Sequence, residues 1–310
     1  MVERPTQRSV AVKPAGDGWV GHFVAMASPC EVILDGADRE RTAQVSADVA
    51  AEAWRIEDKF SRYLEGNIIH RINTAAGSAI ELDEETANLM DFAATLHELS
   101  EGRFDITSGV LRDVWKFDGS DRVPDADSVS AILNRVGWAR IAWQRPRLTL
   151  QAGMEIDLGG IGKEYAVDRC AGIIRDADCG AGLVNFGGDL AVTGPPERRP
   201  AWKVGVEGDT PDAADRLIDL RAGALATSGD ARRYLLRHGV RYGHILDPTT
   251  GWPVQDAPGS VTVAADSCTQ AGMLSTLAML RGSAAKQFLD EQAVTYWVRR
   301  YSRNSLIKIG

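Results

Sequence analysis

The sequence has 310 residues, 44% of them hydrophobic and 25% charged, which is the composition of a globular protein with one large domain or two lobes folded as a unit. Asp and Glu outnumber Lys and Arg by 43 to 35, and the net charge of −8 argues against nucleic-acid binding, which needs a basic face. No stretch approaches the roughly 18 apolar residues of a membrane-spanning helix, so we expect no membrane span.

The N-terminal segment is polar and has no apolar stretch of the kind found in signal peptides or lipoprotein signals. We therefore expect a flexible tail over 1–17, one domain over 18–310 and a cytoplasmic location, although a sequence that had lost an export signal would look the same. The cysteines are scattered without a C-x-x-C pair, which indicates free, mostly buried thiols and argues against a zinc site. They are Cys30, Cys170, Cys179 and Cys268.

In chain order, apolar periodicity predicts a hairpin followed by three amphipathic helices. The hairpin strands are expected at 19–26 and 30–36, and the helices at 39–60, 83–100 and 126–137. The residues expected to face the core from the first two helices are Val45, Val49, Ala53, Ile56 and Phe60, then Leu89, Phe92, Ala93, Leu96 and Leu99.

Strands predominate in the rest of the chain, with turn residues between them and one further helix at about 268–280. The expected strands are 140–143, 147–151, 154–158, 183–186, 190–194, 201–207, 216–220, 224–228, 242–246, 260–265, 294–300 and 305–309. Because strands and helices do not alternate strictly, the pattern predicts an α+β fold with mixed or antiparallel sheets and flanking helices.

The segment DLGGIGKEYAVD, at 157–168, joins glycines and a lysine to the start of a helix. It is not a P-loop, because Lys163 is followed by Glu164, and it lacks the dinucleotide-binding fingerprint. Glycines still allow a phosphate to approach the backbone, a helix N-terminus offers free N–H groups, and the lysine supplies a cation. The segment alone is more often a tight strand-to-helix connection with a solvated lysine.

Four other segments also combine glycines with polar side chains: GRFDITSGVLRDVW, VNFGGDLAV, LATSGD and HILDPTTGWPV. Each on its own is more often structural than functional. His244, for example, is compatible with a histidine at a strand end, and TSGD with a simple turn. Their combination is harder to explain by packing.

In combination and in order, these segments resemble the ApbE-like family, the FAD:protein FMN transferases. The similarity runs from about residue 22 to 282, and DLGGIGKEYAVD with HILDPTTG is its most specific part. Further matching segments are FVAMASPCEV, FSRYLEGNIIHRIN and SVTVAADSCTQAGMLSTLAML.

The resemblance implies two lobes around a central nucleotide cleft that binds FAD, with Mg²⁺ at the pyrophosphate. It implies transfer of FMN to a threonine or serine hydroxyl of a target flavoprotein, as a phosphoester, with release of AMP. The FAD-binding residues that it implies are Met26, Tyr63, Arg103, Phe104, Asp105, Asp157, Lys163, His244 and Ile245. It also places the metal at the backbone carbonyl of Gly160 and at Thr276.

Two histidines lie in the matching segments. His70 stands in what looks like packed structure and is given a structural role. His244 stands beside the turn that the resemblance places at the phosphate, and we assign it as the general base. The ordinary histidine pKa of ~6.5 suits that role at neutral pH.

The sequence departs from the family at one position. The resemblance implies a metal-binding aspartate at position 272, but Gly272 stands there, while Thr276 is kept four residues later on the same helix face. Mg²⁺ is usually held by one or two carboxylates plus substrate phosphates. The remaining ligands could suffice at higher Mg²⁺, another acid such as Asp266 could reach in, or the protein could bind FAD without turnover. An FAD pyrophosphatase, with water as acceptor, is a further alternative.

Overall fold

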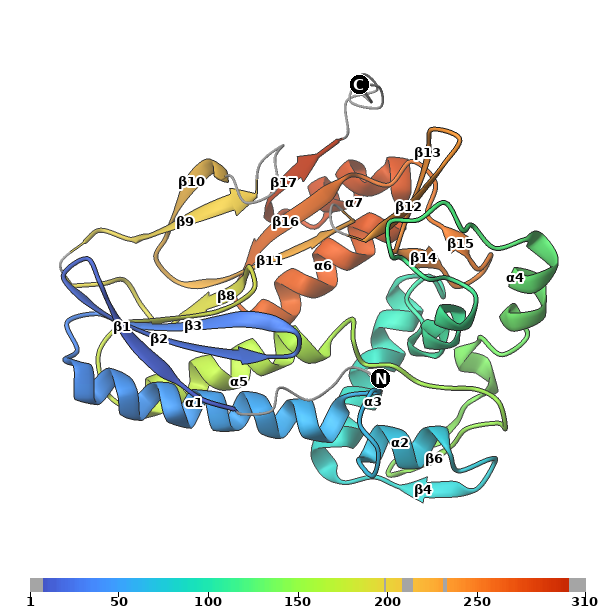
Figure 1. Cartoon of the computed structure of the whole chain (residues 1–310), viewed down its shortest axis with the longest axis horizontal. Helices are drawn as coiled ribbons and strands as arrows, with labels where there is room; N and C mark the ends of the chain where they lie inside the picture. Colours follow the sequence, from blue (N-terminus) through green and yellow to red (C-terminus); the bar gives the residue numbers. More distant parts are fainter. Residues whose placement is uncertain (1–7, 198, 208–213, 231–232, 301–310) are drawn as a thin grey trace.

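The structure is a computed structural model that describes residues 8–197, 199–207, 214–230 and 233–300. Its largest element is an antiparallel eight-stranded sheet in the order β1-β2-β3-β7-β8-β11-β16-β17 (Figure 1). These strands are β1 Ala11–Ala15, β2 Gly18–Ala25, β3 Ser28–Leu34, β7 Gly182–Phe186, β8 Asp189–Val192, β11 Gly223–Gly229, β16 Ser260–Ala265 and β17 Thr295–Arg299.

The N-terminal segment is more ordered than the sequence suggested. Ala11–Ala15 pair with β2, and Arg8 forms ion pairs with Glu57 and Asp58. The expectation of a flexible tail therefore fails from residue 8 onward, whereas 1–7 lie outside the described residues. An exposed edge strand is held by main-chain hydrogen bonds, so it does not need the apolar side chains that reveal a strand in a sequence.

One face of the sheet is covered by helices α1 (Arg39–Phe60), α5 (Gly162–Asp176) and α6 (Cys268–Leu280) (Figure 1). The short helix α7 (Ala285–Glu291) packs on α6. The bounds of α1 and α6 agree with the expected helices, and the five core residues expected in α1 are buried. Helix α6 is buried on nearly every side, which places it at the centre of the core.

The opposite face of the sheet is covered by the antiparallel pair β9 (Trp202–Glu207) and β10 (Ala214–Leu220). Successive side chains of a strand point to opposite faces. On β7, Leu183 therefore packs toward this pair, whereas Val184 packs in the core beneath the helices. The sheet is thus buried on both sides at its centre.

The remaining elements form a second group at the other end of the molecule, drawn mostly in cyan and green in Figure 1. Residues of η1, α4, β12 and the segments beside them share a small core, whereas α2, α3 and β6 contribute to the main core. The small core contains Val110, Leu111, Trp115, Val129, Val136 and Leu235. The helical elements are α2 Ile68–Asn73, α3 Glu84–Leu99, η1 Ile106–Asp113, α4 Ala126–Leu133, η2 Trp138–Arg140 and η3 Gly282–Ala284. The strands are β4 Ala79–Glu81, β5 Ala142–Gln144, β6 Arg147–Thr149, β12 Tyr234–Arg237, β13 Val240–Gly243, β14 Leu246–Asp247 and β15 Trp252–Pro253. The predicted α+β class with antiparallel sheets and flanking helices is confirmed.

Several local expectations were wrong. Segment 154–158 buries alternate residues but forms no strand, because its backbone bonds to a side chain: Ile156 N donates to Asn73 Oδ1 at 2.8 Å. The expected strand 242–246 is two strands interrupted at His244 and Ile245. Leu99, the last residue of α3, is 55% exposed, although Leu96 one turn earlier and the following Ser100 are buried.

Other expectations held in part. The helix predicted over 126–137 ends at Leu133. The expected closing strand 294–300 is β17, while 305–309 lie outside the described residues. All four cysteines are free thiols, and only Cys179 is not fully buried. None of the helices in the described part of the chain is both long and apolar enough to cross a bilayer.

Candidate phosphate-binding site at the N-terminus of α5

The glycine-rich segment is a tight connection that enters α5. Asp157 anchors it, since Asp157 Oδ2 lies 2.6 Å from Arg62 Nη1 and Asp157 Oδ1 accepts the Gly159 N–H at 2.9 Å. Gly160 packs so closely that a Cβ there would lie 3.1 Å from the Phe104 ring. The residue that precedes α5, Ile161, provides no side-chain cap. The Gly162 N–H donates to the Leu158 carbonyl at 2.8 Å, so the N–H groups without a cap are those that follow it in the first turn. Such N–H groups can bind a phosphate.

Lys163 stands in the first turn of α5 and is tied to the sheet. Its Nζ lies 2.6 Å from Oδ2 of Asp189 on β8, whose other oxygen accepts the Thr227 N–H at 3.0 Å. Burial acts to lower the pKa of Lys163, but the charge and hydrogen bond of Asp189 outweigh burial and leave that pKa raised. The lysine therefore remains a cation beside the helix N-terminus.

Hydroxyl groups from β11 and α6 meet near this turn. Ser228 Oγ lies 2.8 Å from Ser275 Oγ and 2.9 Å from Thr276 Oγ1. The carboxylate of Glu164, next to Lys163, is also directed inward, because its Oε2 is buried even though the residue as a whole is only half-buried. That oxygen has no hydrogen-bond partner, and burial together with the nearby Asp189 charge raises the pKa of Glu164.

His244 occupies the break between β13 and β14. Its N–H donates to Arg233 O at 3.2 Å, and its ring meets Phe117 edge-on with centroids 6.3 Å apart. Its Nδ1 is buried without a hydrogen-bond partner. Burial, and then the charge of Arg233, lowers the pKa of His244, so the imidazole is neutral at pH 7. The neighbouring Ile245 carbonyl accepts the Val254 N–H at 3.1 Å.

Met26 and Tyr63 approach from the first part of the chain. Met26 lies in the β2–β3 turn with a left-handed φ of 51°, and its N–H donates to Glu57 Oε1 at 2.8 Å. Tyr63 is 55% exposed, and its hydroxyl accepts from Arg62 Nη2 at 2.8 Å. Because Arg62 also holds Asp157, it joins two of the residues expected to contact FAD.

The three side chains of the segment Arg103–Phe104–Asp105 lie in different environments. Arg103 reaches the last turn of α6, where its Nη1 donates to Leu280 O at 3.3 Å. Phe104 packs against Gly160. The Asp105 carboxylate is buried and accepts the Thr107 N–H, the Thr107 hydroxyl and the Trp138 N–H, each within 2.8 Å. Asp105 therefore acts as a helix cap for η1, and the FAD contact implied for it stays a prediction.

These contacts join Tyr63, Phe104, Asp157, Gly160 and Lys163 at the start of α5. The contacts of Met26, Arg103, Asp105, His244 and Ile245 are with other parts of the fold. Residues that sequence reasoning missed are Arg62, Glu164, Asp189 and Ser228. The last two lie in VNFGGDLAV and LATSGD, which had been singled out without a role for these side chains. His70 lies in α2, where its N–H donates to the Asn67 side chain, in agreement with the structural role expected for it.

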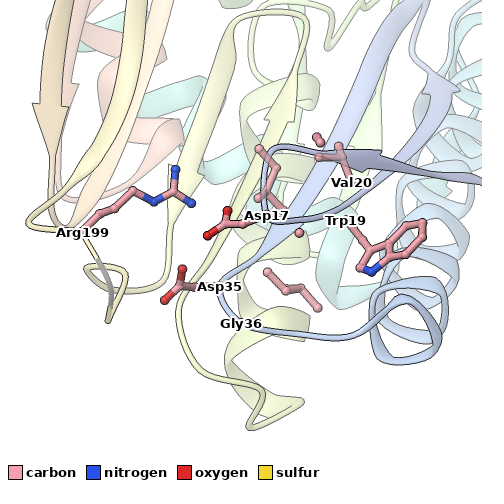
Figure 2. A pocket seen from close by; sticks show the side chains of 10 residues that line it. Asp17, Trp19, Val20, Asp35, Gly36 and Arg199 are labelled. Carbon is pink, nitrogen blue, oxygen red and sulfur yellow. The ribbon is translucent and has the colours of Figure 1, made fainter.

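Two hollows in the surface lie elsewhere. The one in Figure 2 has a volume of about 40 Å³, and Asp17, Asp35 and Arg199 are among its lining residues. That is too small for a dinucleotide, since ligand pockets are typically ~300–1,000 Å³. A hollow of about 370 Å³ is lined by residues that include Asp168 and Asp266. Apart from Asp266, neither hollow contains a residue expected at the site, and the central nucleotide cleft stays a prediction.

The structure is that of an α+β protein in which a helix N-terminus without a side-chain cap, a half-buried lysine and clustered hydroxyls lie beside an antiparallel sheet, an arrangement that can bind a phosphate. Comparison with known proteins gives the particular family. The chain belongs to the ApbE family, whose family model matches residues 26–297. The resemblance seen in the sequence is confirmed.

Similarity to individual relatives and to a solved structure agrees with this family assignment. The FAD:protein FMN transferase of Chlamydia pneumoniae is 33% identical over 253 residues, which cover 78% of this chain and 78% of the relative. That of Vibrio cholerae serotype O1 is 30% identical over 258 residues, 80% of this chain and 75% of the relative. The crystal structure of the ApbE protein of Thermotoga maritima MSB8 is similar with a TM-score of 0.80 and 30% identity, over 94% of both chains.

Proposed function

We propose that this chain, a flavin transferase of the ApbE family, moves FMN from FAD to a threonine or serine hydroxyl of a target flavoprotein. The acceptor oxygen forms a bond to the phosphorus that carries the flavin, the bond from that phosphorus to the AMP oxygen breaks, and AMP leaves. The observation that carries the proposal is the uncapped start of α5 beside the Lys163–Asp189 pair, in a chain that matches the family from 26 to 297.

Positioning and charge neutralisation do most of the work in phosphoryl transfer. In the proposal, the N–H groups of α5 and the Lys163 ammonium bind the phosphates. Met26, Tyr63, Arg103, Phe104, Asp157 and Ile245 are proposed to orient the rest of FAD. His244 accepts the proton of the attacking hydroxyl, and its neutral imidazole is in the correct form for a base.

A divalent cation fits the chemistry of this region. Mg²⁺ prefers oxygen ligands, and Glu164 Oε2 is a buried carboxylate oxygen with no hydrogen-bond partner. The described residues contain no group of three or more His, Cys, Asp or Glu side chains that could hold a metal. The Gly160 carbonyl, Thr276 and substrate phosphates are therefore proposed to complete its coordination. When bound, Mg²⁺ supplies charge neutralisation at the phosphates and at the departing AMP.

The test is intact-mass analysis of a flavoprotein fragment with an acceptor threonine, incubated with this protein, FAD and Mg²⁺. The expected result is a mass increase equal to one FMN esterified to the fragment, absent when the threonine is replaced by valine. Release of FMN and AMP at the same rate without the fragment would instead identify an FAD pyrophosphatase. Binding of FAD without product of either kind would identify a protein that only binds the nucleotide.

A further inference from the structure

We propose that Glu164 supplies the metal-binding carboxylate that this chain lacks at position 272. The inference rests on the proposed function, because it concerns the cation that the transferase would use. It assigns a role to a residue for which neither the sequence motifs nor the comparisons gave one.

The first argument is steric. Gly272 lies in α6, and a Cβ added there would lie 2.5 Å from Glu164 Cγ and 3.1 Å from both Cδ and Oε1. Side-chain atoms do not approach to 2.5 Å, so a residue with a side chain at 272 would have to displace Glu164. The Glu164 carboxylate therefore fills the space that an aspartate at 272 would use, and the glycine is what makes room for it.

The second argument is that Oε2 of Glu164 is a nearby carboxylate oxygen without a hydrogen-bond partner. Asp189 is ion-paired with Lys163. Asp168 accepts the N–H groups of Cys268 and Thr269 at 2.7 and 2.8 Å, which caps α6. Glu164 Oε2, in contrast, is buried with no hydrogen bond. Burying an unpaired carboxylate is costly, and a bound cation would offset that cost.

The third argument is position along α6. Thr276 follows Gly272 by four residues, so its hydroxyl lies on the helix face that the Glu164 carboxylate meets. Asp266, the other candidate acid, is exposed before the N-terminus of α6. At 1.5 Å per residue, the eight steps from Cys268, the first residue of α6, to Thr276 span about 12 Å, and Asp266 lies beyond that start. Asp266 is therefore not the replacement.

Titration with Mn²⁺ in the presence of FAD, with free Mn²⁺ measured by electron paramagnetic resonance, tests the assignment. Glu164→Gln keeps the shape but removes the charge, and it should weaken Mn²⁺ binding by at least ~10–100-fold, the range for losing a residue that only supports a ligand. Asp266→Asn is the matched control and should leave binding unchanged. The exchange Glu164→Gly with Gly272→Asp should restore most of the affinity, whereas Gly272→Asp alone should not improve it.

Thermal unfolding gives a readout that does not depend on turnover. Without metal, Glu164→Gln should unfold close to the wild-type temperature, because the amide keeps the shape of the buried side chain. Added Mn²⁺ should raise the unfolding temperature of the wild type but not of this variant. Unchanged Mn²⁺ affinity in Glu164→Gln, tighter binding in Gly272→Asp alone, or no Mn²⁺ binding by the wild type with FAD would each overturn the assignment. If the Mn²⁺ results hold but no FMN is transferred, the proposed function fails and the assignment of Glu164 stands.

Discussion

The ammonium of Lys163 lies 2.6 Å from the carboxylate of Asp189, and this pair joins the N-terminus of α5 to strand β8. Asp189 is almost completely buried, with a side chain that is 3% exposed, while Lys163 is 29% exposed. Because β8 lies at the centre of the large sheet, the pair ties the proposed phosphate-binding turn to the middle of that sheet. Lys163 therefore has a structural role that is separable from any contact with FAD.

Replacement of Lys163 by alanine should lower the free energy of unfolding by roughly 3–5 kcal/mol, because it leaves Asp189 buried without its counter-charge. Urea unfolding measures this. Lys203→Ala is the control, since Lys203 and Asp219 form a pair at 2.5 Å whose side chains are 61% and 52% exposed, and its loss should cost less than about 1 kcal/mol. Equal effects of the two substitutions would contradict the structural role of Lys163.

Asp105→Ala should destabilise the protein rather than act mainly on FAD affinity. The substitution leaves the Thr107 and Trp138 N–H groups without their acceptor, and an unsatisfied buried donor costs about 1–3 kcal/mol. Unfolding by urea and FAD titration of the folded variant, measured together, separate the two effects. Normal stability with a large loss of FAD affinity would show instead that Asp105 contacts the nucleotide.

Local patterns in the sequence predicted the helices well. The bounds of α1 and α6 could be predicted because each has a capping side chain, Asp38 and Ser267, before an apolar run. Segment 154–158 misled because alternating burial shows only which side chains face the core. It does not show whether a neighbouring strand is present, and here Asn73 satisfies the backbone.

The candidate site was predictable only in part. The glycine-rich turn and His244 stand in motifs that can be recognised locally. The partners of these motifs come from distant parts of the chain, as with Lys163 and Asp189. Glu164 has meaning only beside Gly272, and a relationship across more than a hundred residues depends on how α5 packs on α6.

The protein should bind FAD more tightly than FMN. The residues implied for FAD binding come from both the large sheet with its helices and the second group of elements. Lys163 stands in α5, which packs on the large sheet, whereas Tyr63 precedes α2 and Phe104 precedes η1. Such a spread suits a dinucleotide better than a single phosphate. Calorimetric titration with each nucleotide measures the two dissociation constants, and equal or weaker affinity for FAD would argue against the prediction.

The pH dependence of transfer should reflect the lowered pKa of His244. Its pKa is lowered from the ordinary 6.5 by burial and then by the charge of Arg233, against the opposing effect of Asp230. The neutral form is the active base, so a lowered pKa extends activity toward acid. The acidic limb of kcat/KM should therefore fall below pH 6.5, and a limb at or above that pH would assign it to another group.

His244→Ala should reduce transfer by roughly 10²–10⁴-fold, the usual contribution of a general base. FAD affinity should change little, because the proposed phosphate contacts come from α5 and not from this imidazole. The same intact-mass assay, followed over time, measures the rate, and calorimetry measures the affinity. His70→Ala is the matched control: its helix α2 is held by backbone and cap hydrogen bonds, so transfer should stay near the wild-type rate. Near wild-type transfer by His244→Ala would remove this histidine from the mechanism, and equal losses in both variants would point to a general effect of histidine replacement on the fold.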